Sequence, residues 1–144
     1  MQGISVMVMS MLMGLVGIKR GMSRVFSDNG NTIPVTLLEV NSNRIVQVKT
    51  IEKDGYNAFQ VTNGSVKNEK LIKPQLGHFK KFGVQCGLGL WEFYSEKVDE
   101  YCVGYEIPLS IFKLDEYVDV VGFSKGKGYS GTIKRHNFSR QRMS

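Results

Sequence analysis

Short runs of apolar and β-branched residues alternate along the chain with polar turn sequences. In one of these runs, Val46 and Val48 are separated by Gln47 and followed by Lys49. An apolar–polar period of two is typical of a strand with one buried face. On this pattern we expect strands over residues 12–26, 33–40, 44–51, 56–62, 88–94 and 117–124.

Turn-forming residues separate several of these runs. Asn29-Gly30 follows the first run and Asp54-Gly55 follows the third. Both pairs tolerate the positive φ angles that tight hairpin turns require. Pro34 stands near the start of its run, where a missing backbone donor does least harm.

Residues 73–83 have a different character and predict one short helix. Pro74 is suited to the first turn of a helix and Gly83 to its end. Lys80 and Lys81 would then lie at the negative end of the helix dipole, where cations are favourable.

Together these elements predict a mainly β fold. Many short strands with one helical insertion, around residues 63–87, favour a small β-barrel over alternating βαβ units. A chain of 144 residues is the size of a single domain. We assign this body to residues 13–123, because the composition changes at Ser124.

The first residues are apolar and rich in methionine. Residues 1–18 have no basic region before the apolar stretch and are shorter than the ~20 residues that span a bilayer. We therefore expect neither a signal peptide nor a membrane anchor. Residues 1–12 are interpreted as an extra N-terminal segment, either disordered or an artefact that precedes a true translation start at Met11 or Met13.

The net charge of +6 is concentrated at one end of the chain. Residues 125–144 hold six Lys or Arg and no Asp or Glu. Subtracting these six from the total of 19 leaves 13 basic residues, which the 13 acidic residues balance. A cationic segment on a formally neutral body indicates a polyanionic partner, with nucleic acid favoured over anionic lipid. The segment also lacks the sustained apolar face of an interfacial helix.

Residues 124–144 interleave glycines, aromatic residues and cations, which is the pattern of an RNA-binding extension. Glycine allows close approach to a phosphate backbone, cations neutralise it, and aromatic rings can stack on unpaired bases. The alternative is a solvated basic tail. The candidate RNA contacts here are Lys125, Gly126, Lys127, Gly128, Tyr129, Gly131, Lys134, Arg135, His136, Phe138, Arg140 and Arg142.

Further cations on the body are weaker candidates. Lys19, Arg20 and Arg24 can form a second backbone-contacting patch or an ordinary solvated strand edge. Lys80 and Lys81 join the list from the predicted helix. Trp91 and Phe93 are interpreted mainly as core, with stacking on bases as the alternative, whereas for Phe79 and Phe82 core packing and stacking are left equally open.

Chemistry of other kinds has little support. Residues 126–131 formally match G-x-G-x-x-G, but the residues that follow do not predict an amphipathic helix, and no acidic ribose ligand follows. His78 and His136 are not spaced to share a metal with Cys86 or Cys102, which we interpret as reduced thiols. We therefore expect no enzyme, cofactor, metal site or small-molecule substrate.

Six sequence blocks occur in order and resemble one family. They are GLVGIKRGMSRVF, IPVTLLEV, VQVKTIEKDGYNAFQV, KPQLGHFKKFGV, LWEF and VDVVGFSKGKGYSGTIKRHNF. Together they resemble the bacterial-type large-subunit ribosomal protein L3 family, from about Met13 to the end of the chain.

The resemblance implies a six-stranded barrel of the translation-factor type with a small insertion and a long basic arm. It implies direct binding to large-subunit ribosomal RNA, an early role in subunit assembly, neighbouring ribosomal proteins and a cytoplasmic ribosomal location. The arm of the family is directed toward the peptidyl transferase centre, and Lys125 to Phe138 fall at its root. Since family members continue through the arm and return with closing strands, we expect this chain to be a fragment. Rival hypotheses are a stand-alone barrel for single-stranded RNA and an enzyme with a nucleotide cofactor.

Overall fold

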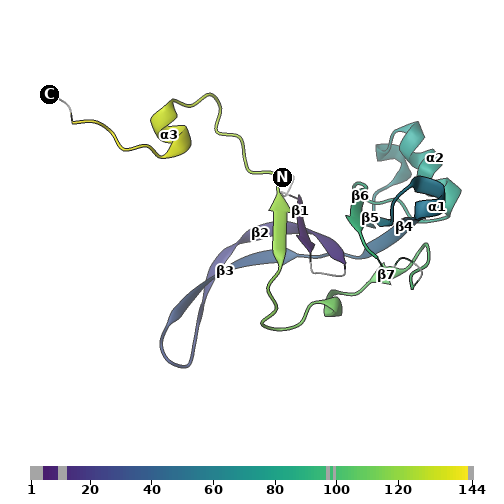
Figure 1. Ribbon diagram of the computed structural model, residues 1–144, viewed down its shortest axis with the longest axis horizontal. Helices are drawn as coiled ribbons and strands as arrows, with labels where there is room; N and C mark the ends of the chain where they lie inside the picture. Colours follow the sequence, from purple (N-terminus) through teal and green to yellow (C-terminus); the bar gives the residue numbers. More distant parts are fainter. Residues whose placement is uncertain (1–4, 10–12, 97, 99, 143–144) are drawn as a thin grey trace.

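The computed structural model describes residues 5–9, 13–96, 98 and 100–142 of the chain. In these residues two four-stranded antiparallel sheets dominate, and the helices are short (Figure 1). The predicted mainly β class is therefore confirmed. The sheets are called sheet A and sheet B below.

Sheet A contains the long hairpin of the molecule. Its strand order is β3-β2-β1-β8. The strands are β1 (Ser5–Met9), β2 (Gly14–Phe26), β3 (Thr32–Glu39) and β8 (Asp119–Gly122). The Asn29-Gly30 turn is confirmed, because the Gly30 N–H donates to the carbonyl of Ser27 at 2.9 Å. The outer part of β2 and β3 projects beyond the remainder of the body (Figure 1).

Sheet B forms the second layer of strands. Its order is β6-β5-β4-β7. The strands are β4 (Asn43–Lys49), β5 (Ala58–Asn63), β6 (Trp91–Tyr94) and β7 (Glu106–Ile107). Neighbouring strands are antiparallel throughout.

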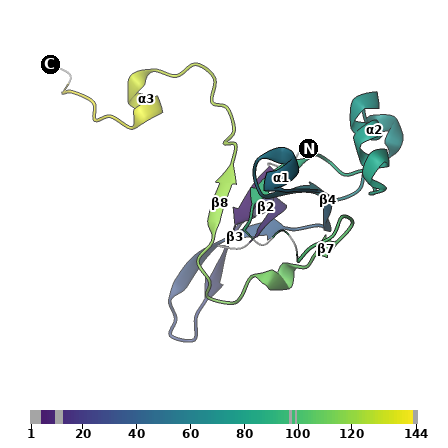
Figure 2. The same cartoon turned by 45° about the vertical axis from the view of Figure 1, so that its right-hand side comes forward.

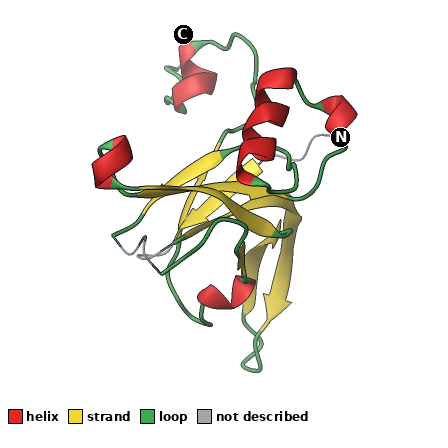
Figure 3. Cartoon of the chain, turned by 90° about the vertical axis from the view of Figure 1, so that its right-hand side faces the viewer, coloured by secondary structure: helices red, strands yellow, loops and turns green. Residues whose placement is uncertain are grey.

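The helices are short; they lie in the connections between strands, except the last, which follows β8 in the terminal segment (Figure 3). They are α1 (Ile51–Asp54), η1 (Asn68–Lys70), α2 (Lys73–Phe82), η2 (Leu109–Ile111) and α3 (Thr132–His136). The predicted helix over residues 73–83 is confirmed as α2. Gly83 ends it with a φ of 65°, a left-handed conformation that glycine adopts without steric penalty.

The core lies between the two sheets at the base of β2. Leu15, Ile45 and Phe59 are fully buried there, together with Val61 and Phe93. A second, smaller cluster joins α2 to sheet B through Val46, Phe79 and Cys86. Burial of the apolar face of α2 is what holds so short a helix in place, because isolated helices of this length are marginal in water.

Two buried asparagines connect the sheets where the core meets the start of β2. The side-chain oxygen of Asn43 accepts from the Val16 N–H at 2.9 Å, and its amide donates to the Val16 carbonyl at 3.1 Å. Asn63 also donates to that carbonyl. These bonds satisfy a stretch of β2 backbone that would otherwise be buried without partners.

Several sequence expectations differ from the structure. The predicted barrel is not closed within the residues that the structure describes, because the strands divide into two separate sheets with free edges. The strand expected over residues 44–51 ends at Lys49, and Ile51 begins α1 instead, since Gly55 caps a helical turn there. The strands expected over 88–94 and 117–124 shorten to β6 and β8.

The N-terminal segment also differs from expectation. Residues 5–9 form β1, which pairs with β2 on one side and β8 on the other. The rest of the segment, residues 1–4 and 10–12, lies outside the described residues. The local sequence predicted no element here, because a strand held between two distant strands depends on non-local hydrogen bonds rather than on local turn signals.

Candidate nucleic-acid interface

The basic segment, residues 124–142, leaves sheet A directly after β8. Every residue in it is exposed except Ser130, which is half-buried. Its six cations therefore face solvent, and none forms an ion pair with a described carboxylate. In Figure 1 the segment runs away from both sheets, with α3 near its middle.

Four of these cations surround one open concavity, which we call the arm hollow. It has a volume of about 610 Å³. Its cationic lining residues are Lys125, Lys127, Lys134 and Arg135. The backbone of Gly126 and Gly128 lines the same space. Exposed amides and cations around one hollow provide donors and positive charge for an anion.

The glycines of the basic segment have two different explanations. Gly128 has a φ of +69°, so the turn itself favours glycine. Gly126 and Gly131 have no such φ, and a Cβ added at either would meet nothing within 4 Å. The fold of this chain therefore does not require glycine at those two positions, and they leave the backbone open to a partner.

The helix α3 organises the far side of the hollow. The Arg135 N–H donates to the carbonyl of Gly131 at 3.0 Å. Lys134, Arg135 and His136 occupy the last turn, where cations interact favourably with the helix dipole. The His136 ring stacks on Phe138, with ring centroids 5.6 Å apart and an interplanar angle of 28°.

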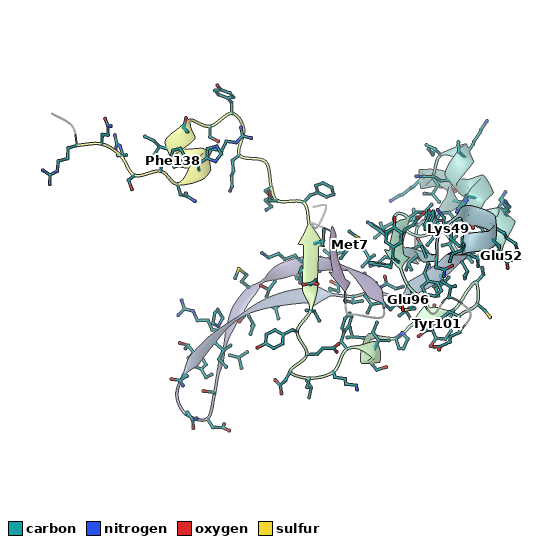
Figure 4. The ribbon with its side chains drawn as sticks, in the orientation of Figure 1. Met7, Lys49, Glu52, Glu96, Tyr101 and Phe138 are labelled. Atoms are coloured by element: carbon teal, nitrogen blue, oxygen red, sulfur yellow. The ribbon has the colours of Figure 1, made fainter. Side chains whose placement is uncertain are left out.

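The aromatic candidates of the segment are accessible. Tyr129 is fully exposed, and the Phe138 side chain, labelled in Figure 4, is 58% exposed. Exposed rings of this kind are accessible for stacking on another flat ring. Arg140 lines a second open concavity of about 540 Å³ beside α3, and Arg142 lies exposed beyond it. The structure thus groups the nearer candidates around the hollow and leaves Arg142 apart.

The candidate patch on β2 is partly neutralised. Arg20 donates a hydrogen bond to the Glu39 carboxylate across the hairpin, next to a β-bulge. This bond raises the pKa of Arg20 and lowers the pKa of Glu39. Lys19 and Arg24 are exposed and are not ion-paired to any described carboxylate. Arg20 is therefore the least available of the three cations.

The cations at the end of α2 are available. Lys80 and Lys81 are exposed in its last turn, and the Lys81 ammonium lies 5.5 Å from the centroid of the Phe82 ring. His78 has a structural contact instead, because its Nε2 lies 2.6 Å from the side-chain oxygen of Gln60 on β5.

Sequence analysis missed a polar network on sheet B. Lys49 Nζ lies 2.7 Å from a Glu92 carboxylate oxygen, and the Tyr56 hydroxyl donates to the other oxygen at 2.9 Å. Gln60 also donates to Glu92, at 3.1 Å. These bonds lower the pKa of Glu92 and raise that of Lys49. The sequence does show opposite charges, Lys49 and Glu92, on polar positions of two alternating strands. The pairing register of β5 and β6 was needed to predict that these two side chains meet.

Other kinds of site were searched for in the described part of the chain. No group of three His, Cys, Asp or Glu residues there is placed to hold a metal ion. No described helix is long and apolar enough to cross a membrane. No amphipathic helix was expected after the G-x-G-x-x-G motif; a helix, α3, does begin at Thr132, but none of its residues is buried. It has only five residues and β8 pairs antiparallel, so the parallel βαβ unit of a dinucleotide site is not formed here.

Comparison with known proteins identifies the family. Residues 91–144 match the model of the family described as ribosomal protein L3. The large ribosomal subunit protein uL3 of Aliivibrio fischeri is 53% identical over 132 residues, which cover 92% of this chain and 63% of the relative. The chain belongs to the ribosomal protein L3 family. In that family, large ribosomal subunit protein uL3 of Vibrio cholerae is 52% identical over 132 residues, again 92% of this chain and 63% of the relative.

A third relative gives the same picture. The protein of the same name from Xylella fastidiosa is 56% identical over 128 residues, covering 88% of this chain and 60% of the relative. The chain therefore spans about 63% of the length of the first relatives that it matches. The ribosomal protein L3 match at residues 91–144 includes β6, β8 and the whole basic segment, so the arm hollow lies inside the matched region.

Proposed function

We propose that this chain is a structural constituent of the large ribosomal subunit, and that residues 124–142 bind large-subunit ribosomal RNA. The main observation in favour of RNA binding is the arm hollow. Its lining contains four cations, Lys125, Lys127, Lys134 and Arg135, around one open space, and no carboxylate. The names of the relatives, large ribosomal subunit protein uL3, support the assignment.

RNA backbone fits this surface better than a small anion does. A concavity of about 610 Å³ with four cations is larger and more charged than one phosphate requires. Tyr129 and the stacked His136–Phe138 pair border it in sequence and offer aromatic faces for unpaired bases. The open backbone at Gly126 and Gly131 lets a strand of RNA lie against the chain. The proposed mechanism is electrostatic and positional, with no turnover and no cofactor.

The remaining proposals come from the family. We propose that the chain acts early in large-subunit assembly, in the cytoplasmic ribosome, beside neighbouring ribosomal proteins. The basic segment is the root of an arm directed toward the peptidyl transferase centre. Sheets A and B supply strands of a six-stranded barrel of the translation-factor type, which the free edge of β8 leaves open to further strands.

A salt series tests RNA binding by the arm hollow. The chain is bound to a large-subunit ribosomal RNA fragment, and the logarithm of the binding constant is plotted against the logarithm of salt concentration. Lys125→Gln/Lys127→Gln removes two phosphate contacts, so the slope is expected to become shallower by roughly 1.4, at ~0.7 per contact for single strands. Lys53→Gln/Lys113→Gln removes two exposed cations of the body and is the matched control. Equal slopes for the two double variants would overturn the role of the hollow.

A second candidate is a stand-alone protein that binds single-stranded RNA outside ribosomes. The exposure of Tyr129 and Phe138 favours it, since stacking on unpaired bases needs no ribosome. Co-sedimentation with assembling large subunits separates the two candidates. Recovery with the subunit precursors supports the ribosomal role, and binding to RNA without such recovery supports the stand-alone role.

A further inference from the structure

The exposed face of α2 carries lysines around one glycine. At 100° per residue, Lys73, Gly77, Lys80 and Lys81 fall within one stripe of about 100° centred near Gly77. All four residues are exposed. The surrounding insertion is also basic: residues 63–87 contain five lysines and one carboxylate, Glu69.

Gly77 is not explained by the fold of the chain. A glycine inside a helix is less favourable than alanine, because it loses more backbone freedom on folding. Its φ is not positive, and a Cβ added there would meet nothing within 4 Å. A side chain would therefore be tolerated and would stabilise α2, so no contact among the described residues accounts for glycine at this position.

The opposite face of α2 fixes the direction of the stripe. Phe79 is 2% exposed and packs against Val46 and Cys86. His78 contacts Gln60 of β5 at 2.6 Å. Because these contacts hold the helix to sheet B from one side, the lysines and Gly77 are presented outward on a fixed element.

The stripe and the basic segment lie on the same, upper side of the molecule, at opposite ends of its longest axis (Figure 1). Figures 1, 2 and 3 share a vertical axis, and in all three views α2 and α3 lie toward the top. The tip of the β2–β3 hairpin lies at the bottom of Figures 1 and 2. A single large polyanion can therefore reach both cationic surfaces, and two linked contacts bind more tightly than either alone.

We propose that the stripe of Lys73, Gly77, Lys80 and Lys81 is a second contact surface for the RNA sugar–phosphate backbone. The lysines neutralise phosphates and Gly77 lets the backbone approach the helix. This inference rests on the proposed function for its partner, but it uses a different element and different residues. RNA is favoured over an acidic protein surface because a long, continuous polyanion can span from the stripe to the basic segment at the other end of the longest axis.

Gly77→Gln tests the proposal without changing any charge. Glutamine is a good helix former, so the melting temperature of the chain is expected to rise by roughly 3 °C. The added side chain holds RNA away from the flanking lysines. The salt slope with large-subunit RNA is then expected to become shallower by roughly 1.4, equivalent to two lost single-strand contacts. Ser110→Gln, at an exposed residue of η2, is the control for adding bulk elsewhere.

A charge variant guards against an unforeseen effect of Gly77→Gln on folding. Lys73→Gln/Lys80→Gln leaves the packed face of α2 intact and is compared with Lys53→Gln/Lys113→Gln. A shallower slope in the α2 variants than in their controls supports the proposal. Slopes equal to the controls, with the arm variant still defective, overturn this surface alone. If the unmodified chain shows no salt-dependent RNA binding, the proposed function and this surface both fall.

Discussion

At the residue scale, hydrogen bonds of polar side chains stabilise the body, and these bonds could not be predicted from the sequence. Asn43 bonds both backbone groups of Val16, and Glu92 accepts from Lys49, Tyr56 and Gln60. Lys49, labelled in Figure 4, is 17% exposed at its side chain. Buried or half-buried polar groups with several partners fix one arrangement of neighbouring strands, because any slip would leave them unpaired.

The Glu92 network makes stability depend on pH. Hydrogen bonds from Lys49, and secondarily from Tyr56 and Gln60, lower the pKa of Glu92 from its ordinary 4.5 in the folded chain. The unfolded chain therefore binds more protons, and this contribution is complete above pH ~4.5 and is lost as the pH falls through the lowered pKa. Glu92→Gln is expected to reduce stability near neutral pH and to flatten the fall of stability as the pH drops below ~4.5, measured by urea unfolding. Glu52→Gln, at an exposed residue of α1, is the control, and an equal dependence in both variants would contradict this account.

At the element scale, the two ends of β2 differ in packing: its first residues lie against the core, and its later residues have free space around them. A Cβ added at Gly14 would lie 2.2 Å from two ring carbons of Phe93, whereas at Gly21 it would meet nothing within 4 Å. Gly14 thus allows close packing at the core, whereas Gly21 lies at the β-bulge and meets no such packing requirement.

Two alanine substitutions on this strand test the difference. Gly14→Ala is expected to lower the free energy of unfolding by about 1–3 kcal/mol, because the Phe93 ring must move within a packed core. Gly21→Ala is expected to leave it unchanged or slightly raised, since it reduces the freedom of the unfolded chain without a clash. Thermal unfolding followed by circular dichroism measures both. Equal melting temperatures would show that Phe93 adapts freely.

Local elements could be predicted from the sequence because their signals are local. Gly83 after residues 73–82 and the Asn29-Gly30 turn are each read from a few adjacent residues. The end of β4 was misplaced because Gly55 turns four residues into α1. The strand β1 and the division into two sheets were missed, since both depend on pairings between residues far apart in sequence.

The candidate interface was predictable to a similar extent. The cations of residues 124–142 could be chosen from charge spacing alone, and the structure gathers four of them around one hollow. The neutralisation of Arg20 by Glu39 could not be foreseen, because it depends on the register of β2 and β3 across a bulge. Two residues of the stripe on α2, Lys80 and Lys81, were already candidates from the sequence. The role proposed for Gly77 could be inferred only once the buried face of the helix was known.

At the scale of the whole molecule, a packed body carries an exposed basic extension. All but one of residues 124–142 are exposed. Trypsin is therefore expected to cut first in that segment, at Lys125, Lys127, Lys134 or Arg135, because proteases act on accessible chain. Mass spectrometry of the early products measures the order of cleavage. Bound large-subunit RNA is expected to slow these cuts, whereas cleavage of the body at an equal rate would contradict the division into body and extension.

The pairing of β1 with β8 has a consequence for the order in which the chain folds. Met9 and Asp119 are paired although 110 positions separate them, so sheet A closes only after almost the entire body has been synthesised. Such high contact order slows folding, since the entropy of closing a long loop is lost before the pairing is gained. The β2–β3 hairpin and sheet B can assemble earlier from nearer partners. The basic segment, residues 124–142, is thus expected to extend from a completely folded body only late in the folding of the chain.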